Sequence, residues 1–245
     1  MCFLLVAHRM FAEAPLIVAA NREEYYARPS APPHLWASEP QILGGTDLLA
    51  GGTWLAINEH GLLVAVTNRP WPAATLDSPS RGQLARELLT LPTAEAAAER
   101  ALDRLRSEPF AGANFCCCDR MSAFVIEHGP ATRARRLSTG LHFLSNGDVD
   151  DPADARISFA RGQLDEQPPT NPSELIDAAR ALLAQPADAE LRSGIIVQLA
   201  DRGTVSSTIV SLTAGGRAGT YLYAAGPPDR TAYEDYSPLL AELLR

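Results

Sequence analysis

Met1-Cys2-Phe3-Leu4-Leu5-Val6-Ala7 opens the chain with a thiol directly ahead of an apolar run. Cysteine is small enough for the processing peptidase to remove the preceding methionine, which would leave Cys2 with a thiol and a free α-amine on one Cα. Because the α-amine has an ordinary pKa of about 7.7–8.0 and the thiol one of about 8.5, the amine can accept the thiol proton near neutral pH. Cys2 is therefore a candidate nucleophile that carries its own base. The alternative is that Cys2 is simply the first residue of a buried strand.

Length and composition predict an ordinary globular protein. The 245 residues favour a single domain, 1–245, that can bury roughly 70–75% of its unfolded surface without disulfides or a metal. A net charge of −8 argues against nucleic acid or an anionic membrane as partner. The apolar start is too short to cross a membrane and lacks a charged leader, so we expect no integral membrane segment and a cytoplasmic location.

The remaining cysteines, Cys116-Cys117-Cys118, are consecutive. Neighbouring residues of a strand point to opposite faces, so this triplet cannot converge on one metal ion or form a sensible disulfide framework. We expect small strand residues in a reducing compartment and no metal site.

A hairpin predicts which residues accompany Cys2. Residues 2–9 and 16–21 are expected strands around a turn centred near residue 12, which places Arg22 opposite Cys2 or, if the register slips, one residue away. The cluster Asn21-Arg22-Glu23-Glu24 would then lie beside the amino terminus. A guanidinium there favours the thiolate, and a carboxylate can orient the α-amine. Alternatively, the cluster is a polar strand end that turns into solvent.

Two further amides are expected at strand ends. Asn68 follows an expected strand at 62–67, and Asn146 follows one at 141–144. A side-chain amide in this position can donate to an oxyanion, although an asparagine there more often caps a turn.

The remaining elements predict an α+β fold with helices outside the sheets. Residues 25–41 are expected to form an irregular loop, and the paired glycines at 44–45 and 51–52 to allow tight turns or close approach to a ligand. Expected hairpins are 113–119 with 122–127, and 132–137 with 141–144; late strands are 204–212 and 220–225. Expected helices are 81–91, 93–106, 236–245, and two that start at Asp151-Pro152 and Asn171-Pro172.

Several motifs resemble the NRDE proteins, the relatives of transport and Golgi organisation protein 2. They are Met1-Cys2, Ala20-Asn21-Arg22-Glu23-Glu24-Tyr25-Tyr26, Arg28-Pro29, Gly51-Gly52-Thr53-Trp54-Leu55, Ser80-Arg81-Gly82, Leu144-Ser145-Asn146 and Ser206-Ser207-Thr208-Ile209-Val210. Glu23 departs from the family motif, which has Asp there. Val205 stands where a basic residue is expected before the late strand, and Arg202 is only a distant substitute.

A second resemblance concerns the mechanism. Asn58-Glu59-His60-Gly61-Leu62, followed by Asn68, is similar to a stretch of choloylglycine hydrolases and penicillin V acylases, which are N-terminal-nucleophile hydrolases with a four-layer αββα sandwich. The resemblance implies Cys2 as nucleophile with its own amine as base. It further implies that Arg22 and Glu23 flank and tune Cys2, that Asn21 is a neighbouring donor, and that Asn68 and Asn146 hold the oxyanion or the α-amine.

Two functions are consistent with these residues. The first is an amidohydrolase or acyltransferase that acts on a small acyl-amide or thioester through an acyl-thioester on Cys2 and needs no cofactor. The second, implied by the NRDE resemblance, is a non-catalytic protein that binds or carries haem or lipid on the same fold. Either way, we expect the ligand to be a small molecule.

Overall fold

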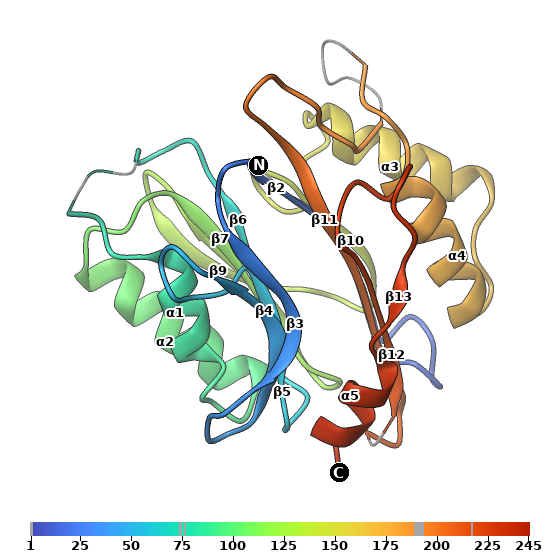
Figure 1. Ribbon diagram of the computed structural model, residues 1–245, viewed down its shortest axis with the longest axis horizontal. Helices are drawn as coiled ribbons and strands as arrows, with labels where there is room; N and C mark the ends of the chain where they lie inside the picture. The colour runs from blue at the N-terminus through green and yellow to red at the C-terminus, as the bar shows by residue number, and fades with distance from the viewer. Residues whose placement is uncertain (1, 74, 76, 189–193, 217) are drawn as a thin grey trace.

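Two β-sheets stacked face to face form the middle of the molecule (Figure 1). The computed structural model describes residues 2–73, 75, 77–188, 194–216 and 218–245, and within these residues every strand pairing in the sheets is antiparallel. Sheet A runs, in spatial order, through β10 (Gly140–Leu144), β1 (Cys2–His8), β2 (Leu16–Tyr25), β11 (Arg202–Leu212), β12 (Gly219–Ala224) and β13 (Glu234–Asp235). Sheet B runs through β3 (Ser30–Trp36), β4 (Ile42–Asp47), β5 (Leu55–Asn58), β6 (Leu63–Asn68), β7 (Ala113–Cys118), β8 (Ala123–His128) and β9 (Thr132–Arg136).

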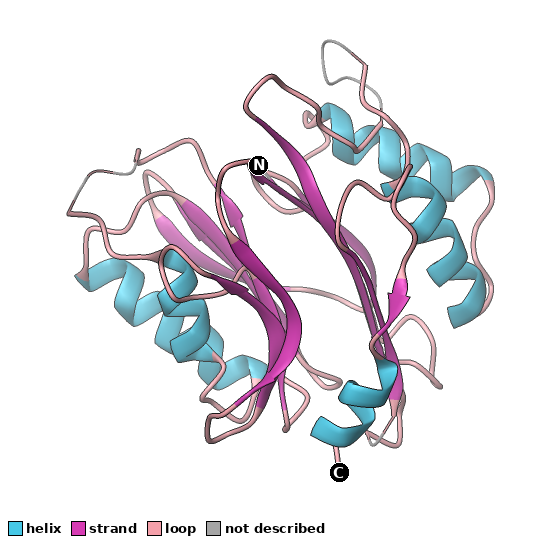
Figure 2. Ribbon diagram, in the orientation of Figure 1, coloured by secondary structure: helices cyan, strands magenta, loops and turns pink. Residues whose placement is uncertain are grey.

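Helices cover the outer face of each sheet, so the layers follow the order helix, sheet, sheet, helix (Figure 2). Sheet B carries α1 (Arg81–Leu88) and α2 (Ala94–Ser107), and sheet A carries α3 (Ala155–Glu166) and α4 (Pro172–Leu183). The carboxy-terminal α5 (Ser237–Leu243) contacts β12 of sheet A and β3 and β4 of sheet B. The predicted α+β class and four-layer αββα sandwich are confirmed.

The apolar run after Cys2 forms β1 because both of its faces are buried. Leu4 and Val6 lie in the core between the sheets, whereas Phe3 and Leu5 pack with apolar residues of α3 and α4. β1 pairs with β10 on one side and β2 on the other, and so lies second from the edge of sheet A. β10 pairs with β1 from Leu4 onward, and β2 pairs along the whole strand, so the position of Cys2 is fixed by its pairing with β2.

The prediction of an irregular loop over 25–41 is wrong for residues 30–36, because β3 forms there, whereas residues 26–29 and 37–41 lie outside the strands. Pro32 and Pro33 lie where the register between β3 and β4 shifts, between Ala31 and His34. Since β3 is the edge strand of sheet B, its prolines do not remove hydrogen bonds needed by a second neighbour.

The predicted hairpin of 132–137 with 141–144 is also wrong. β9 pairs with β8 in sheet B, whereas β10 pairs with β1 in sheet A, so the chain crosses from one sheet to the other. This crossing places the turn after β10, which contains Asn146, beside the end of β6 in the opposite sheet.

Helix starts follow their capping side chains. Asn171 accepts a hydrogen bond from the Glu174 N–H at 3.0 Å, as the sequence predicts for α4. The start expected at 151–152 is three residues early, because Asp154 caps α3 and accepts from the Arg156 N–H at 2.9 Å.

Candidate active site

Strand pairing places Cys2 directly opposite Arg22 across β1 and β2, as predicted. Both residues are on the face of sheet A that looks toward sheet B, since Cys2 packs with Leu4 and Ala20 in the core between the sheets. Met1, whose removal the proposed chemistry requires, lies outside the described residues.

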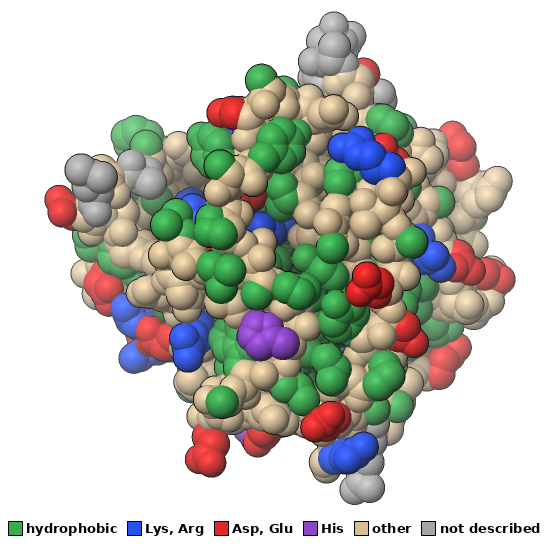
Figure 3. Space-filling model, in the orientation of Figure 1, with side chains coloured by type: hydrophobic (Ala, Val, Ile, Leu, Met, Phe, Trp, Pro, Cys, Tyr) green, Lys and Arg blue, Asp and Glu red, His purple; other side chains and the backbone are tan. Residues whose placement is uncertain are grey.

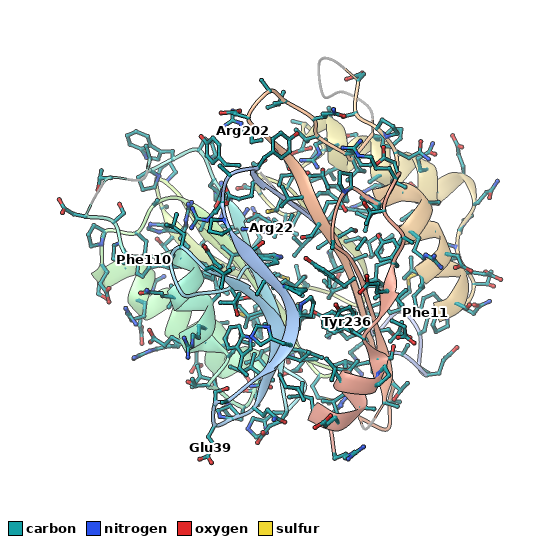
Figure 4. The ribbon with its side chains drawn as sticks, viewed as in Figure 1. Phe11, Arg22, Glu39, Phe110, Arg202 and Tyr236 are labelled. Carbon is teal, nitrogen blue, oxygen red and sulfur yellow. The ribbon has the colours of Figure 1, made fainter. Side chains whose placement is uncertain are left out.

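The Arg22 guanidinium is buried between the sheets (Figure 4). Its Cζ lies 4.1 Å from the centre of the Trp54 ring, and Nη1 donates to Ser30 Oγ at 3.3 Å. In the described part of the chain, no carboxylate oxygen lies within 4.0 Å of this guanidinium. Burial lowers the pKa of Arg22, and the nearby Cys2 sulfur opposes that shift. Arg22 is therefore a buried cation whose charge is available to the thiol.

Two effects compete at the Cys2 thiol. Burial raises its pKa above the ordinary value, while the backbone N–H of Glu23 and the charge of Arg22 act in the opposite direction. Burial is the larger effect, so the pKa of the thiol is raised overall. Arg22 and the Glu23 N–H favour the thiolate once the proton leaves.

Asn21 and Glu23 point to the other face of sheet A because side chains alternate along β2. Asn21 Nδ2 donates to the Leu183 carbonyl oxygen at 2.9 Å and ties β2 to the end of α4. The side chain of Asn21 is thus directed away from the thiol, whereas Cys2, Arg22 and Asn68 are brought together.

Glu23 forms a buried ion pair with Arg156 of α3. Arg156 Nη1 donates to Glu23 Oε2 at 3.2 Å, Nη2 donates to Oε1, and Nη2 also donates to the Ile195 carbonyl oxygen at 2.8 Å. Burial raises the pKa of Glu23, and Arg156 opposes that shift. Sequence reasoning missed Arg156, because nothing in the pattern of α3 indicates that it faces β2.

The two predicted amides meet where the sheets adjoin. Asn68 ends β6 and lines the same cleft as Cys2. Asn146, in the turn after β10, donates from Nδ2 to the Asn68 carbonyl oxygen at 2.6 Å. Asn146 therefore holds the backbone of Asn68 in place.

A polar network that the sequence analysis did not identify fixes the turn containing Asn146. Arg69 Nη1 donates to the Gly147 carbonyl oxygen at 2.8 Å, and its Nη2 lies 2.8 Å from Asp148 Oδ1. The buried Asn114 of β7 donates to the same Gly147 oxygen at 2.9 Å. An amide inside the otherwise apolar strand 113–118 was the signal that could have revealed it.

These residues surround a cleft of about 310 Å³. Its walls include Cys2, Arg22, Glu24, Arg28, Asp47, Thr53, Trp54, Val66, Asn68, Ser80, Arg81, Gly82 and Ala111. In the space-filling view, blue atoms are recessed below the surrounding surface in the region where Figure 4 labels Arg22 (Figure 3). Arg202 is exposed, and its Cζ lies 5.7 Å from the centre of the Tyr25 ring. It therefore does not take the place of the basic residue missing at Val205.

The cysteine triplet lies inside β7 and is fully buried. Cys116 and Cys118 face the core between the sheets, with their sulfur atoms 3.2 Å apart, and Cys117 faces α1 and α2. Among the described residues, no three His, Cys, Asp or Glu side chains are grouped as metal ligands. No helix in the described ranges combines the length and apolar character needed to cross a membrane.

The Transport and Golgi organisation 2 (TANGO2) family matches residues 1–222. This chain belongs to the TANGO2 family. The mouse Transport and Golgi organization 2 homolog is 45% identical over 78 residues, which is 31% of this chain and 28% of the mouse protein. The *Drosophila melanogaster* protein is 31% identical over 134 residues, or 50% of this chain and 43% of that protein. The matches therefore span less than half the length of these curated TANGO2 relatives.

Solved structures with the same fold are hydrolases of the N-terminal-nucleophile class. The *Caenorhabditis elegans* ortholog of N-acylethanolamine-hydrolyzing acid amidase superposes with a TM-score of 0.56 at 14% identity and covers 85% of this chain and 92% of its own. A variant of the conjugated bile acid hydrolase from *Clostridium perfringens* gives a TM-score of 0.60 at 10% identity, with 96% and 92% coverage. At these identities the likeness shows the fold alone.

Proposed function

We propose that this TANGO2-family protein is an N-terminal-cysteine amidohydrolase or acyltransferase that acts on a small acyl-amide or thioester. The observation that carries the proposal is the meeting of Cys2 and Arg22, from sheet A, with Asn68, from sheet B, in one cleft. Nucleophile, cation and amide donor come from different strands, and each is a group that acyl transfer needs.

The proposed reaction uses Cys2 as the amino-terminal residue. Its α-amine takes the thiol proton as Sγ bonds to the acyl carbon, and the carbonyl electrons move onto oxygen. The Asn68 amide stabilises that oxyanion, and Asn146 holds Asn68 in position. The C–N or C–S bond then breaks, and the ammonium returns its proton to the leaving group. Water, or an amine in the transferase reaction, attacks the acyl-thioester and releases Sγ.

Glu23 and Asn21 have supporting parts in this proposal. The Glu23 carboxylate, held by Arg156, orients the α-amine at the start of β1, and its backbone N–H stabilises the sulfur anion. Asn21 keeps β2 in place through Leu183 rather than by touching substrate.

The test begins with the intact mass of the purified protein, which should lack Met1. A screen of acyl-amides and thioesters on wild type and Cys2→Ser should then give turnover with wild type alone, and acid quenching should trap an acyl adduct on Cys2. Protein that retains Met1 and still turns over substrate would contradict the amine-as-base mechanism.

The second candidate, carriage of haem or lipid without chemistry, rests on the resemblance to the NRDE proteins, since the family name itself states no ligand. Among the described cleft residues, Cys2 is the side chain of a type that ligates haem iron, through its thiolate. A haem titration followed by absorbance on wild type and Cys2→Ser tests this directly. Saturable binding, together with no turnover of any substrate, would favour carriage.

A further inference from the structure

Positively charged side chains gather in the cleft from three separate elements. Arg22 comes from β2, Arg28 from the segment after it, and Arg81 from the first turn of α1. Arg28 is neutralised, because its Nη2 lies 2.5 Å from Asp47 Oδ2 and its Nε lies 3.8 Å from Glu24 Oε2. The other two guanidiniums have no carboxylate oxygen within 4.0 Å in the part of the chain that the structure describes.

Arg81 is held against the cleft by the backbone around it. A Cβ on Gly52 would lie 2.2 Å from the Gly82 carbonyl carbon, so only glycine lets the 51–53 loop come this close to the start of α1. The Thr53 N–H donates to the Gly82 oxygen at 3.1 Å. Arg81 Nη1 donates to the Gly112 carbonyl oxygen at 2.9 Å, which occupies one of the five N–H donors of the guanidinium.

Burying the Arg81 guanidinium in the cleft costs free energy. Burial lowers the pKa of Arg81, which reflects the loss of hydration around its charge, and the more distant Glu24 carboxylate opposes that shift. Glu24 and Asp47 also line the cleft, but both carboxylates lie beside Arg28 rather than Arg81. Arg22 is used by the Cys2 thiol opposite it, which leaves the Arg81 charge without a task in the chemical step.

We infer that Arg81 binds an anionic group, a carboxylate or a phosphate, on the part of the substrate that does not react. A guanidinium suits either group because its parallel N–H donors match two oxygens of the anion. The inference deepens the proposed function, since it takes Cys2 as the reacting group. It identifies the substrate as a small acyl compound with a negative charge away from the scissile bond.

The first experiment measures anion preference at Cys2 without any turnover. Iodoacetate and iodoacetamide differ by one negative charge, and the Cys116–Cys118 thiols are fully buried, so labelling of the folded protein reports on Cys2. For each protein, the rate of Cys2 alkylation by iodoacetate is divided by the rate with iodoacetamide, and this ratio is divided by the same ratio for glutathione. The resulting value should be about tenfold lower in Arg81→Gln than in wild type at low salt. Arg81→Lys should keep most of the wild-type ratio.

The matched control is Arg86→Gln, which removes the same charge from an exposed position on the same helix. Its ratio should equal that of wild type. A ratio unchanged in Arg81→Gln, or lowered equally in Arg86→Gln, would overturn the inference. Because the readout is labelling, the two failures can be told apart: absence of turnover would reject the proposed function, whereas the labelling ratio alone decides whether Arg81 binds an anion.

A second arm identifies the anion by protection. Butyrate, methyl phosphate and neutral butyramide are each added before iodoacetamide, and the rate at Cys2 is followed by mass spectrometry. Protection by butyrate alone assigns a carboxylate, and protection by methyl phosphate alone assigns a phosphate. In both cases protection should be lost in Arg81→Gln. Protection by neither anion, or equal protection by butyramide, would contradict the assignment.

Discussion

At the scale of single residues, the reactivity of Cys2 is set by burial against charge. Burial raises the pKa of the thiol, and Arg22 lowers it. We therefore expect alkylation by iodoacetamide to reach half its maximal rate above the ordinary thiol pKa of about 8.5. Arg22→Gln should move this midpoint to still higher pH, because it removes a positive charge that favours the thiolate.

The measurement is the pH profile of Cys2 labelling by mass spectrometry at limiting reagent. Arg202→Gln is the control, because Arg202 is exposed and stacks on Tyr25. A midpoint that moves to lower pH in Arg22→Gln, or labelling of Cys116–Cys118 ahead of Cys2, would contradict this account.

Asn68 carries the second prediction at this scale. If its amide stabilises an oxyanion, Asn68→Ala should lower kcat by about 10²–10³ with little change in KM. Asn146→Ala should also lower kcat, but by less, because Asn146 acts on the Asn68 backbone through a 2.6 Å hydrogen bond. Steady-state kinetics on an acyl-amide found in the screen measures both. An increase in KM with unchanged kcat in both variants would show that these amides contribute to ground-state binding instead.

At the scale of elements, the Glu23–Arg156 pair joins β2 to α3. Arg156→Met should lower the free energy of unfolding by about 3–5 kcal/mol at neutral pH, because it removes the guanidinium that pairs with a buried carboxylate. Arg100→Met is the control: its ion pair with Glu87 is exposed and should be worth at most about 1 kcal/mol. Urea unfolding measures both changes.

The same pair predicts a pH dependence. The pKa of Glu23 is raised in the folded state, so its contribution to stability is greatest below the unfolded pKa and is lost as pH rises through the folded pKa. Arg156→Met raises the folded pKa further. The deficit of this variant should therefore shrink in acid, and Glu23→Gln combined with Arg156→Met should recover part of the loss at pH 7. A deficit that grows in acid would contradict this.

At the scale of the whole molecule, the site depends on how the two sheets are joined. Asn114 of β7 and Arg69, which directly follows β6, hold the Gly147 carbonyl of the turn that leaves sheet A. Asn114→Ala should cost about 1–3 kcal/mol of stability and also lower kcat, because Asn146 and Asn68 lose their shared alignment.

The control is Asn58→Ala. Asn58 is equally buried, but its Nδ2 donates to the Leu89 and Leu91 carbonyl oxygens, away from the cleft. Comparable destabilisation with unchanged kcat is expected for Asn58→Ala. If both variants lose kcat equally, general destabilisation explains the effect and the joining of the sheets does not.

Much of the fold could be predicted because its signals are local. The register of Cys2 with Arg22 follows from the length of one turn, and α2 and α4 start at recognisable caps. The β3 strand was missed because prolines usually indicate a loop, and only its place at a sheet edge permits them. The opposite orientation of Asn21 and Glu23 was available from the two-residue period, once β2 is extended to Tyr25.

The sequence by itself determined the first hairpin, the α+β class and the residues that mark the TANGO2 family. Only the tertiary structure decided which distant partners these residues meet. Glu23 and Arg156 are 133 positions apart, and Asn68 and Asn146 are 78 apart. Periodicity and capping indicate whether a local segment forms a helix or a strand. Contacts between distant residues depend instead on which helix covers which face of a sheet and on where the chain crosses between the sheets. Those choices are made by packing of the whole core, and no local pattern encodes them.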